Sequence, residues 1–403
     1  MASSARILGE IKRMKITLLP YDDPGAGKPF AALASALQAG GYEAGVAVPA
    51  GSDPYPAHSG TDRALMPRRV WRLPGLKKGG LEKEGAGDGY GNLPEVCAES
   101  DLIITDLRML ESALAVSDEL NSKLIAAALT PPCPVSRSAA VVPDVLKKLP
   151  FFYGAVRKRE AGYAWPLTFK VVQDKLILRD IPVLHAYSSC FLKRPGEWGG
   201  AAGRIVTGEW ITTTAGPGDF ICSSKSCEDT EQWLDEGEAP LYFGFSGLPL
   251  QAQAHCIGTA LDAARVFSCR AVIEADCELP GYALPIEEAD YDRLFPRCRC
   301  VVHRGSAAAA HASLRAGIPA LVCPAAAEEQ VWGKLTVTTG AGSCLPLNKV
   351  TQKKLTQALK VLEHKRVKNK AAELGKGLRQ ENGIETAISF IDRYLSWTQY
   401  RKF

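Results

Sequence analysis

The sequence predicts an α/β fold with two Rossmann-like domains facing a central cleft, and three observations lead to this class. The 403 residues exceed what one ordinary hydrophobic core needs, so we expect two domains. Short apolar segments of strand length alternate with longer segments of helical periodicity along much of the chain. Each half opens with a strand and a glycine-containing loop, which is how a doubly wound parallel sheet begins.

The first half begins with a predicted βαβ unit. Lys15–Pro20 is a compact apolar strand, and the loop 21–28 follows it. Pro29–Ala39 carries apolar residues at helical spacing, and Ala44–Val48 is the second strand. Further strands are expected at Leu102–Thr105, within Ser122–Leu129, at Val183–Ala186 and at Ile205–Thr207.

Two stretches lack a regular period. Residues 51–92 are rich in Gly, Pro and charge, so we predict mainly surface loops there. Residues 215–227 are rich in Gly, Ser and Thr, which suits an interdomain linker. We therefore expect an N-terminal domain at 1–214, a linker at 215–239, a C-terminal domain at 240–385, and a closing helical segment at 386–403.

The second half continues the same alternation. Segment 290–333 is its most informative part, because a short strand, a tight turn, an alanine-rich helix, a second strand and a loop follow one another. The helix is ended by Gly317. The predicted elements are Leu241–Phe245 (strand), Ala252–Arg265 (helix), Ala271–Glu274 (strand), Cys300–Val302 (strand), Ala307–Ala316 (helix), Ala320–Cys323 (strand), and helices in Thr351–Leu362 and Lys370–Trp397.

The turn His303–Ser306 predicts an anion site. A turn of small residues that opens a helix leaves backbone N–H groups and the positive end of the helix dipole directed at one point. Phosphate and diphosphate groups bind at such helix N-termini. We therefore expect an anionic ligand in front of Ala307.

Composition excludes several classes of function. A formal charge of +4 with scattered basic residues gives no reason to expect a nucleic-acid partner. A Lys- and Arg-rich stretch, 353–370, is interpreted as a solvated helix face, with contact to an anionic membrane surface as the alternative. No apolar run is long enough to span a membrane, and the 12 cysteines form no CxxC pair. These features favour a cytoplasmic protein with reduced thiols and no metal site.

Five motifs together resemble the GT-B glycosyltransferases of the UDP-glycosyltransferase superfamily, in particular those related to sterol glucosyltransferases and glycopeptide-antibiotic glycosyltransferases. They are YFGFSGLP at 242–249, LFPRC at 294–298, VHRGSAAAA at 302–310, LRAGIP at 314–319 and the Trp–Gly pair at 332–333.

The resemblance implies an inverting transferase, a UDP-sugar-dependent hexosyltransferase. It would move a hexose from a nucleotide diphosphate sugar, with UDP-glucose as the expected donor, to a hydroxyl of a lipophilic, sterol-like or polyketide-like acceptor. The UDP-sugar is a co-substrate, no separate cofactor is expected, and the oligomeric state stays open. The alternative is a degenerate, non-catalytic member that binds a nucleotide sugar, a lipophile or a partner protein.

The resemblance implies that the N-terminal domain at 1–214 binds the acceptor, that the C-terminal domain at 240–385 binds the nucleotide sugar, and that the helix at 386–403 packs back toward the N-terminal domain. It also assigns donor-site residues. Arg304 stands where the family has a second histidine, and alanines at 308–310 replace Gly-Thr-Thr. The family's sugar-binding Asp-Gln pair corresponds to Glu328 and Glu329, or to Glu329 and Gln330 in a register shifted by one. The expected diphosphate ligands are His303, Arg304, Gly305, Ser306, Ala307, Ala308, Ser246 and Gly247, and the expected neighbours of the nucleotide base are Glu288, Ala289 and Phe295.

The catalytic base is the least determined residue. The family's loop aspartate corresponds to Ala26, so the candidates are Asp22 and Asp23 in the same loop, and Asp106 at the end of a strand. For His185 we expect a role in the core or at the domain junction. Residues expected in the acceptor pocket, with an ordinary core role as the alternative, are Phe151, Tyr153 and Trp165.

Overall fold

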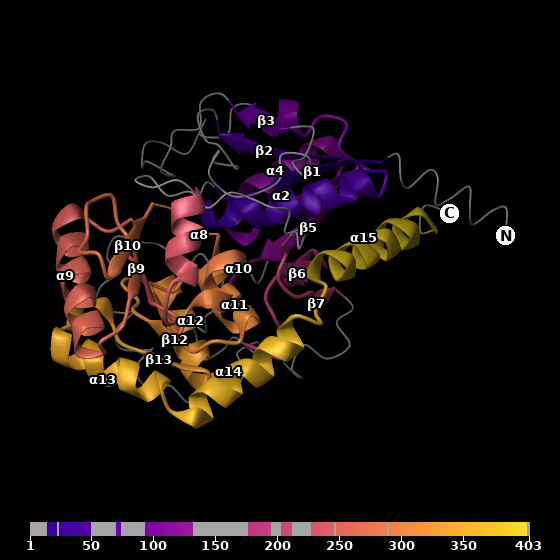
Figure 1. Ribbon diagram of the computed structural model, residues 1–403. Helices are drawn as coiled ribbons and strands as arrows, with labels where there is room; N and C mark the ends of the chain where they lie inside the picture. Colours follow the sequence, from indigo (N-terminus) through magenta and orange to yellow (C-terminus); the bar gives the residue numbers. More distant parts are fainter. Residues whose placement is uncertain are drawn as a thin grey trace.

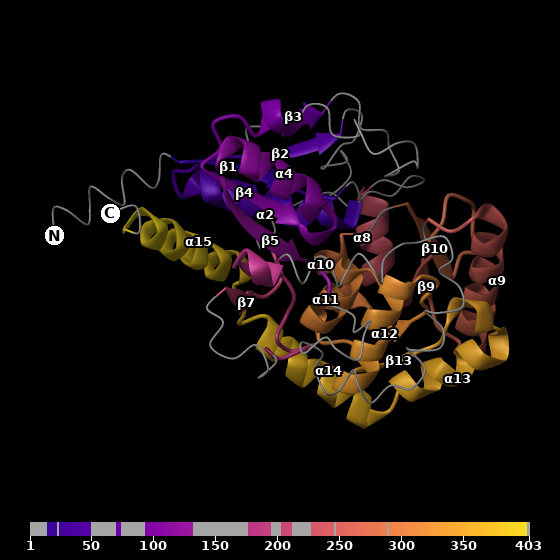
Figure 2. The same ribbon diagram turned by 180° about the vertical axis from the view of Figure 1, so that it is seen from behind.

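Two α/β units lie one above the other in the computed structural model (Figure 1, Figure 2). Each unit contains one fully parallel sheet with helices packed on it, as the sequence predicts. The structure describes residues 14–21, 24–49, 70–73, 93–131, 176–194, 203–211, 227–245, 247–287 and 290–400.

The N-terminal sheet has seven described strands in the order β3-β2-β1-β4-β5-β6-β7. The strand order reverses direction between β1 and β4, where Leu19 pairs with Thr105. Ligands bind outside the carboxyl ends of the strands at such a switch point. The strands are β1 (Lys15–Leu19), β2 (Glu43–Pro49), β3 (Val70–Leu73), β4 (Leu102–Asp106), β5 (Lys123–Ala128), β6 (Val183–His185) and β7 (Arg204–Val206).

Helices cover this sheet with apolar faces. α2 (Pro24–Ala39) buries Phe30, Leu33 and Leu37 in one core cluster with β1 and β4. α4 (Leu110–Leu120) belongs to a second cluster. Two short helices, η2 (Leu107–Met109) and α3 (Leu93–Val96), also belong to the described part of this unit.

The start of α2 differs from the prediction. The helix begins at Pro24 rather than at Pro29, so Pro29 lies inside it. A proline at the sixth position removes only one helical hydrogen bond, to the carbonyl of residue 25, and the small residues before it allow the earlier start. Because a proline in a helical pattern normally marks a boundary, the sequence alone favoured the later one.

The C-terminal sheet repeats the topology with six described strands in the order β10-β9-β8-β11-β12-β13. Its switch point lies between β8 and β11, where His303 pairs with Gly244 on one side and with Val322 on the other. The strands are β8 (Leu241–Gly244), β9 (Ala271–Glu274), β10 (Ala283–Ile286), β11 (Cys300–His303), β12 (Ala320–Val322) and β13 (Gly342–Cys344).

Helices surround this second sheet. α9 and α13 pack against each other, and α11 packs on α14. The helices are α8 (Cys227–Asp235), α9 (Leu250–Val266), α10 (Tyr291–Leu294), η4 (Phe295–Arg297), α11 (Ala307–Ala316), α12 (Ala327–Thr339), η5 (Leu347–Lys349), α13 (Gln352–Leu362) and α14 (Lys365–Leu378).

Several elements were not predicted. Residues 70–73 form an edge strand inside the stretch expected to be loops, and α12 replaces the loop expected before Gly333. The strands β10 and β13 were also missed, because β10 contains a proline and β13 begins with a glycine, and both residue types are depleted in strands. α12 carries β-branched residues at its C-terminal end, so its helical propensity is weak and tertiary packing decides.

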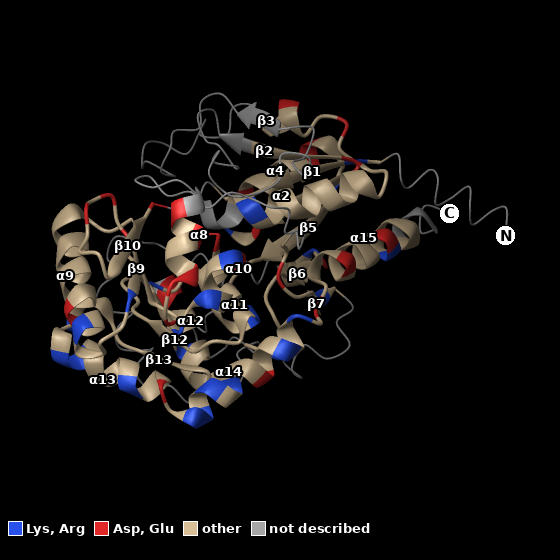
Figure 3. Ribbon diagram, in the orientation of Figure 1, with Lys and Arg blue, Asp and Glu red and all other residues tan. Residues whose placement is uncertain are grey.

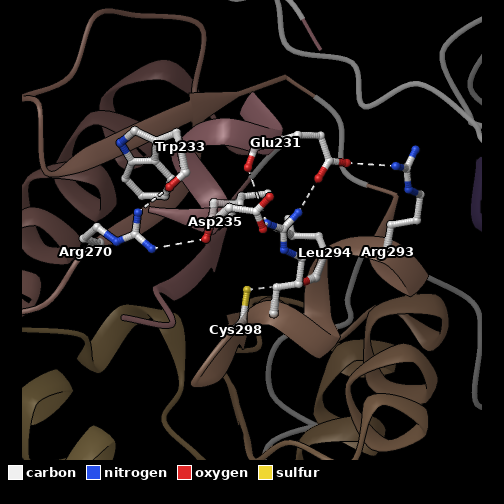
Figure 4. Close-up of polar contacts among 9 residues, drawn as sticks. Glu231, Trp233, Asp235, Arg270, Arg293, Leu294 and Cys298 are labelled. Carbon is white, nitrogen blue, oxygen red and sulfur yellow. Dashed lines mark hydrogen bonds and ion pairs between the residues drawn. The ribbon is translucent and has the colours of Figure 1, made fainter. Parts of the chain in front are cut away.

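α8 lies inside the stretch predicted as a linker, and ionic contacts dock it on the C-terminal unit (Figure 4). Glu231 accepts hydrogen bonds from Arg293 at 2.8 Å and from Arg297. Arg297 is the arginine of the LFPRC motif, so the motif contributes to docking. Arg270 donates to the carbonyl oxygen of Trp233 at the helix end and lies 4.3 Å from the centre of the Trp233 ring.

The last helix, α15 (Gly383–Tyr400), lies against α2 of the N-terminal unit. Its apolar residues Ala387, Phe390 and Ile391 share a core cluster with α2 and β1. Tyr42 donates a hydrogen bond to Asp392. The chain therefore crosses from the C-terminal unit back to the first domain, as Figure 1 and Figure 2 show. Among the helices that the structure describes, none combines the length and the apolar character that a membrane span requires.

Candidate functional site

The carboxyl ends of the two sheets face each other. Thr130 follows β5 of the first sheet, and Glu328 lies in the first turn of α12, just after β12 of the second sheet. The Thr130 hydroxyl donates a hydrogen bond of 2.8 Å to Glu328 Oε1. The loops after the strands of both sheets therefore border one region, which is where open α/β sheets bind ligands.

The loop between β11 and α11 requires glycine at its centre. Gly305 has a φ of +112°, in the region that favours glycine. A Cβ atom there would lie 2.7 Å from the carbonyl oxygen of Glu329 and 2.9 Å from Val322 Cγ1. The loop therefore packs directly against the start of α12, and a larger residue would separate the two.

His303 is a neutral, buried hydrogen-bond donor at the end of β11. Its side chain is 2% exposed, and Nδ1 accepts a hydrogen bond from the N–H of Gly305 at 3.1 Å. Nε2 therefore carries the proton, and it has no hydrogen-bond partner in the part of the chain that the structure describes. Burial lowers the pKa of His303 to about 3. The ring is thus uncharged at neutral pH, with one buried N–H available to a ligand.

The N-terminus of α11 presents two further donors. Ser306 caps the helix by accepting a hydrogen bond from the N–H of Ala309 at 3.2 Å. Within the described residues, the N–H groups of Ala307 and Ala308 have no such acceptor. Together with the helix dipole they form an anion-binding end.

The alanines that replace the family's Gly-Thr-Thr divide into two kinds. Ala309 and Ala310 are each 1% exposed and belong to two different core clusters, so they pack the underside of α11. Ala308 is exposed. The alanines lack the two threonine hydroxyls, but the backbone N–H groups of the first turn are still present.

Arg304 lies where three strand-end loops meet. Its Nη2 donates to Glu329 Oε1 at 2.7 Å. A Cβ atom on Gly247, in the loop after β8, would lie 3.2 Å from Arg304 Nη1. The guanidinium therefore lies beside the loops that follow β8, β11 and β12, which is the region predicted to hold the diphosphate.

The two acidic residues predicted to bind the sugar have different hydrogen-bond partners. Glu329 Oε2 accepts hydrogen bonds from the N–H groups of Ala325 (2.6 Å) and Ala326 (2.9 Å), so Glu329 caps its own helix. Glu328 is exposed and is bonded to Thr130 of the other unit. Gln330 is partly exposed. Ser246, Glu288 and Ala289 lie outside the described residues.

Phe295 is part of the core. Its ring is fully buried, and its centre lies 4.6 Å from that of Tyr291 and 4.9 Å from that of Tyr242. The side chain is therefore covered by protein, and only the backbone near residue 295 is left for the predicted contact with a nucleotide base.

Glu274, which the sequence reasoning missed, lies next to this aromatic group. It is 4% exposed at the end of β9 and accepts hydrogen bonds from the hydroxyls of Tyr242 and, at 3.4 Å, Tyr291. Burial and the Glu274 carboxylate hold the pKa of Tyr242 well above its usual value. A carboxylate at the end of an apolar strand is the only sequence signal that could have indicated it.

Asp106 is bound by a neighbouring arginine. It is 3% exposed; its Oδ1 accepts from the backbone N–H (2.8 Å) and Nε (2.9 Å) of Arg108, and its Oδ2 accepts from Nη2 at 2.9 Å. The guanidinium of Arg108 lies 4.3 Å from the centre of the Tyr21 ring. Both carboxylate oxygens are thus engaged at the switch point of the first sheet.

The other candidates of the first domain are only partly described. Asp22 and Asp23, between Tyr21 and the start of α2, lie outside the described residues. The same holds for the predicted acceptor residues Phe151, Tyr153 and Trp165. His185 is buried at the end of β6 with its ring against Tyr187, and burial lowers the pKa of His185 to about 3.

His311 joins α11 to the first unit and was also missed. Its Nδ1 donates to the carbonyl oxygen of Ala307 at 2.8 Å, and its Nε2 accepts from the N–H of Ser188 at 3.0 Å. The ring lies 4.9 Å from that of Trp332 and 5.1 Å from that of Phe191. A histidine in an otherwise alanine-rich helix was the available signal. Among the described residues, no cluster of three or more His, Cys, Asp or Glu side chains could hold a metal ion.

Comparison with known proteins shows that the chain is similar in sequence to glycosyltransferases. Residues 278–383 match the family model of the erythromycin biosynthesis protein CIII-like C-terminal domain. A sterol 3-beta-glucosyltransferase of Arabidopsis thaliana is 24% identical over 96% of this chain and 69% of its own length. The O-mycaminosyltylonolide 6-deoxyallosyltransferase of Streptomyces fradiae is 28% identical over 53% of this chain and 50% of its own length.

Solved structures decide the fold. The crystal structure of LpCGTa in complex with UDP has a TM-score of 0.69 at 12% identity and covers 95% of this chain and 99% of its own. The kitacinnamycin glycosyltransferase has a TM-score of 0.65 at 15% identity, with 94% and 99% coverage. The fold is GT-B. The predicted fold class and the predicted kinship with sterol and antibiotic glycosyltransferases are confirmed.

Proposed function

We propose that this GT-B protein is an inverting glycosyltransferase that moves a hexose from a UDP-sugar, with UDP-glucose as the expected donor, to a hydroxyl of a lipophilic acceptor. The observation that carries the proposal is the convergence of His303, Arg304 and the first turn of α11 at the switch point of the second sheet. A sterol acceptor is suggested by the name of one relative, and O-mycaminosyltylonolide by the name of another.

The β11–α11 loop supplies what a departing diphosphate needs. Negative charge on the leaving UDP grows as the bond to the anomeric carbon breaks. The N–H groups of Ala307 and Ala308, the buried Nε2–H of His303 and the Arg304 guanidinium are donors already held in place. Preorganised donors of this kind stabilise developing charge because they need little reorganisation during the reaction.

The attacking side of the reaction is assigned to the N-terminal domain. A base takes the proton of the acceptor hydroxyl, whose oxygen attacks the anomeric carbon from the face opposite UDP. We assign the base to Asp22 or Asp23, because both oxygens of Asp106 are bonded to Arg108. Their loop follows Leu19, which pairs with Thr105, so it starts beside Asp106 at the same edge of the sheet. The acceptor pocket is assigned to the region that contains Phe151, Tyr153 and Trp165.

Nucleotide binding and sugar transfer test the proposal separately. UDP at a hundred times its dissociation constant should stabilise the fold by about 2.7 kcal/mol, seen as a higher unfolding temperature. Transfer is measured by mass spectrometry with UDP-glucose and a panel of sterols and polyketide aglycones, where a mass gain of one hexose is expected. Absence of both a thermal shift and titration heat with UDP and UDP-glucose would contradict the donor assignment.

A second candidate is a non-catalytic GT-B protein that binds a nucleotide sugar. The engagement of Asp106 by Arg108 and the alanines at 308–310 favour it. The two candidates differ in turnover. A catalytic protein hydrolyses or transfers from UDP-glucose, and it loses most of that activity in the Asp22→Ala or the Asp23→Ala variant. A binding protein shows UDP-glucose affinity and no turnover in the wild type.

A further inference from the structure

Two departures from the family pattern form one contact in the structure. Arg304 stands where the family has a second histidine, and in the register counted back from Trp332 and Gly333, Glu329 stands where the family has the glutamine of its Asp-Gln pair. The two are 25 residues apart in sequence, yet Arg304 Nη2 lies 2.7 Å from Glu329 Oε1. Both side chains are largely covered, at 24% and 17% exposure. A cation and an anion have thus replaced two neutral residues at adjoining positions.

We infer that Arg304 and Glu329 are a coupled replacement that positions the guanidinium at the donor diphosphate, and that Glu328, rather than Glu329, binds the sugar hydroxyls. The inference rests on the proposed function. If it is correct, the effect of replacing Arg304 depends on the residue at position 329, and only one carboxylate of the acidic pair contacts the sugar.

The hydrogen bonds of Glu329 fix its role. One carboxylate oxygen accepts from the N–H groups of Ala325 and Ala326, and the other accepts from Arg304. Turning this carboxylate toward a sugar would remove the cap of α12 and break the ion pair. The carbonyl oxygen of Glu329 also lies against Gly305, so its backbone is held by the β11–α11 loop. Glu329 is therefore a positioning residue.

Charge explains why the two replacements belong together. An unpaired carboxylate beside the diphosphate would repel the donor, because like charges at short distance are unfavourable in a partly buried site. Arg304 cancels that charge. A guanidinium has five N–H donors in a planar fork, so it can bind a carboxylate and a phosphate at the same time. The pair as a whole is neutral, like the histidine and glutamine it replaces.

Glu328 has the position and the freedom that Glu329 lacks. It is exposed at the N-terminus of α12, and Thr130 of the opposite domain holds one of its oxygens at 2.8 Å. An ionised carboxylate has about four acceptor sites, so one hydrogen bond from Thr130 leaves others for a sugar diol. Thr130 orients Glu328 from across the two domains, which links the sugar contact to the domain arrangement.

A double-mutant cycle tests the coupling. Arg304→His should weaken UDP binding at least about tenfold, because Glu329 is left unpaired beside the diphosphate. Adding Glu329→Gln restores the family pattern, and the double variant should return to within about threefold of the wild type. Titration calorimetry gives the affinities. A double variant as weak as Arg304→His would overturn the coupling.

The ratio of UDP-glucose to UDP affinity separates the two carboxylates. Glu328→Ala should lower the affinity for UDP-glucose about tenfold and leave that for UDP unchanged. Thr130→Val should do the same more weakly. Glu329→Gln should change both affinities by the same factor. Selective loss of UDP-glucose in Glu329→Gln, with no selective loss in Glu328→Ala, would reverse the assignment.

Unfolding temperatures measured without nucleotide test the Arg304–Glu329 ion pair independently of the proposed function. The midpoints of Arg304→His, Glu329→Gln and the double variant should be non-additive in the absence of any nucleotide; additive shifts would refute the ion pair even in a protein that binds UDP. Failure of the wild type to bind UDP would instead overturn the proposed function and, with it, the assigned role of Glu328. The matched control is Arg299 with Glu363, a pair at 2.6 Å with similar exposure, whose cycle should leave UDP affinity unchanged.

Discussion

At the scale of single residues, burial determines the protonation state of His303. Its ring is an uncharged donor because burial lowers the pKa of His303 to about 3, far below the usual 6.5. The sequence indicated a histidine at a strand end, and the resemblance assigned it to the diphosphate. Its tautomer could not be predicted, because that depends on the N–H of Gly305, which reaches Nδ1 only in the folded turn.

His303 makes stability depend on pH in a known direction. Its pKa is lower in the folded protein, so the unfolded chain binds more protons below about pH 6.5, and stability falls as the pH falls from 6.5 toward 3. Its contribution to that slope is about 1.4 kcal/mol per pH unit. Urea unfolding of the wild type and of His303→Asn between pH 7 and pH 4 measures it. Equal slopes in the two proteins would show that His303 is not buried as a neutral ring.

Gly305 can be tested by adding one methyl group. Gly305→Ala places a Cβ atom 2.7 Å from the Glu329 carbonyl oxygen at a φ of +112°, so we expect a loss of about 2–4 kcal/mol and of UDP binding. Gly258→Ala is the control, since Gly258 lies in α9 with nothing within 4 Å of the added atom. It should stabilise by about 0.5–1 kcal/mol. A tolerated Gly305→Ala would mean that the loop does not pack on α12.

At the scale of elements, α11 could be predicted from the sequence, whereas α12 could not. α11 spans the predicted residues Ala307–Ala316, because alanine favours helix and Gly317 stops it in the left-handed conformation. α12 was missed because its start depends on Glu329, a side chain whose capping bonds and ion pair form only when two loops meet. The backbone donors at the start of α11 could be predicted from the sequence, but the different bonding partners of Glu328 and Glu329 could not.

The docking of α8 gives a prediction at this scale. Arg270 donates to the carbonyl oxygen of Trp233 and lies over the Trp233 ring (Figure 4). It also donates to the carbonyl oxygen of Glu238, just after α8, so it holds the C-terminal end of this helix. Arg270→Ala should cost about 2 kcal/mol and shift the Trp fluorescence to longer wavelength. Arg265→Ala is the control, because Arg265 is 63% exposed. Similar losses in both variants would show that Arg270 has no special role.

At the scale of the whole molecule, two sheets of the same topology present their switch points to each other, and α15 ties the C-terminal chain to the first domain. The parallel α/β architecture of both domains followed from the alternation of strands and helices, but contacts between the domains, such as those of Thr130 and His311, have no local signal. Charge is also uneven at this scale: Lys and Arg follow α13 and α14 along the lower edge of Figure 3 with few acidic residues between them.

The role of α15 predicts coupled stability. Ile391 of α15 is fully buried in the core cluster of the N-terminal unit. Ile391→Ala should therefore lower the free energy of unfolding by about 2–5 kcal/mol and lower the unfolding temperature of the first domain. Val361→Ala removes a residue that is 42% exposed on α13 and should cost less than about 1 kcal/mol. Calorimetric scans of both variants check this. Equal effects would show that α15 is not part of the first core.

The first turn of α11 is proposed to bind the diphosphate of a UDP-sugar, and a crystal structure of the complex with UDP would show whether it does. We expect the β-phosphate within hydrogen-bond distance of the N–H groups of Ala307 and Ala308 and of His303 Nε2, with Arg304 still bonded to Glu329. UDP bound elsewhere, or bound without contact to this turn, would contradict it.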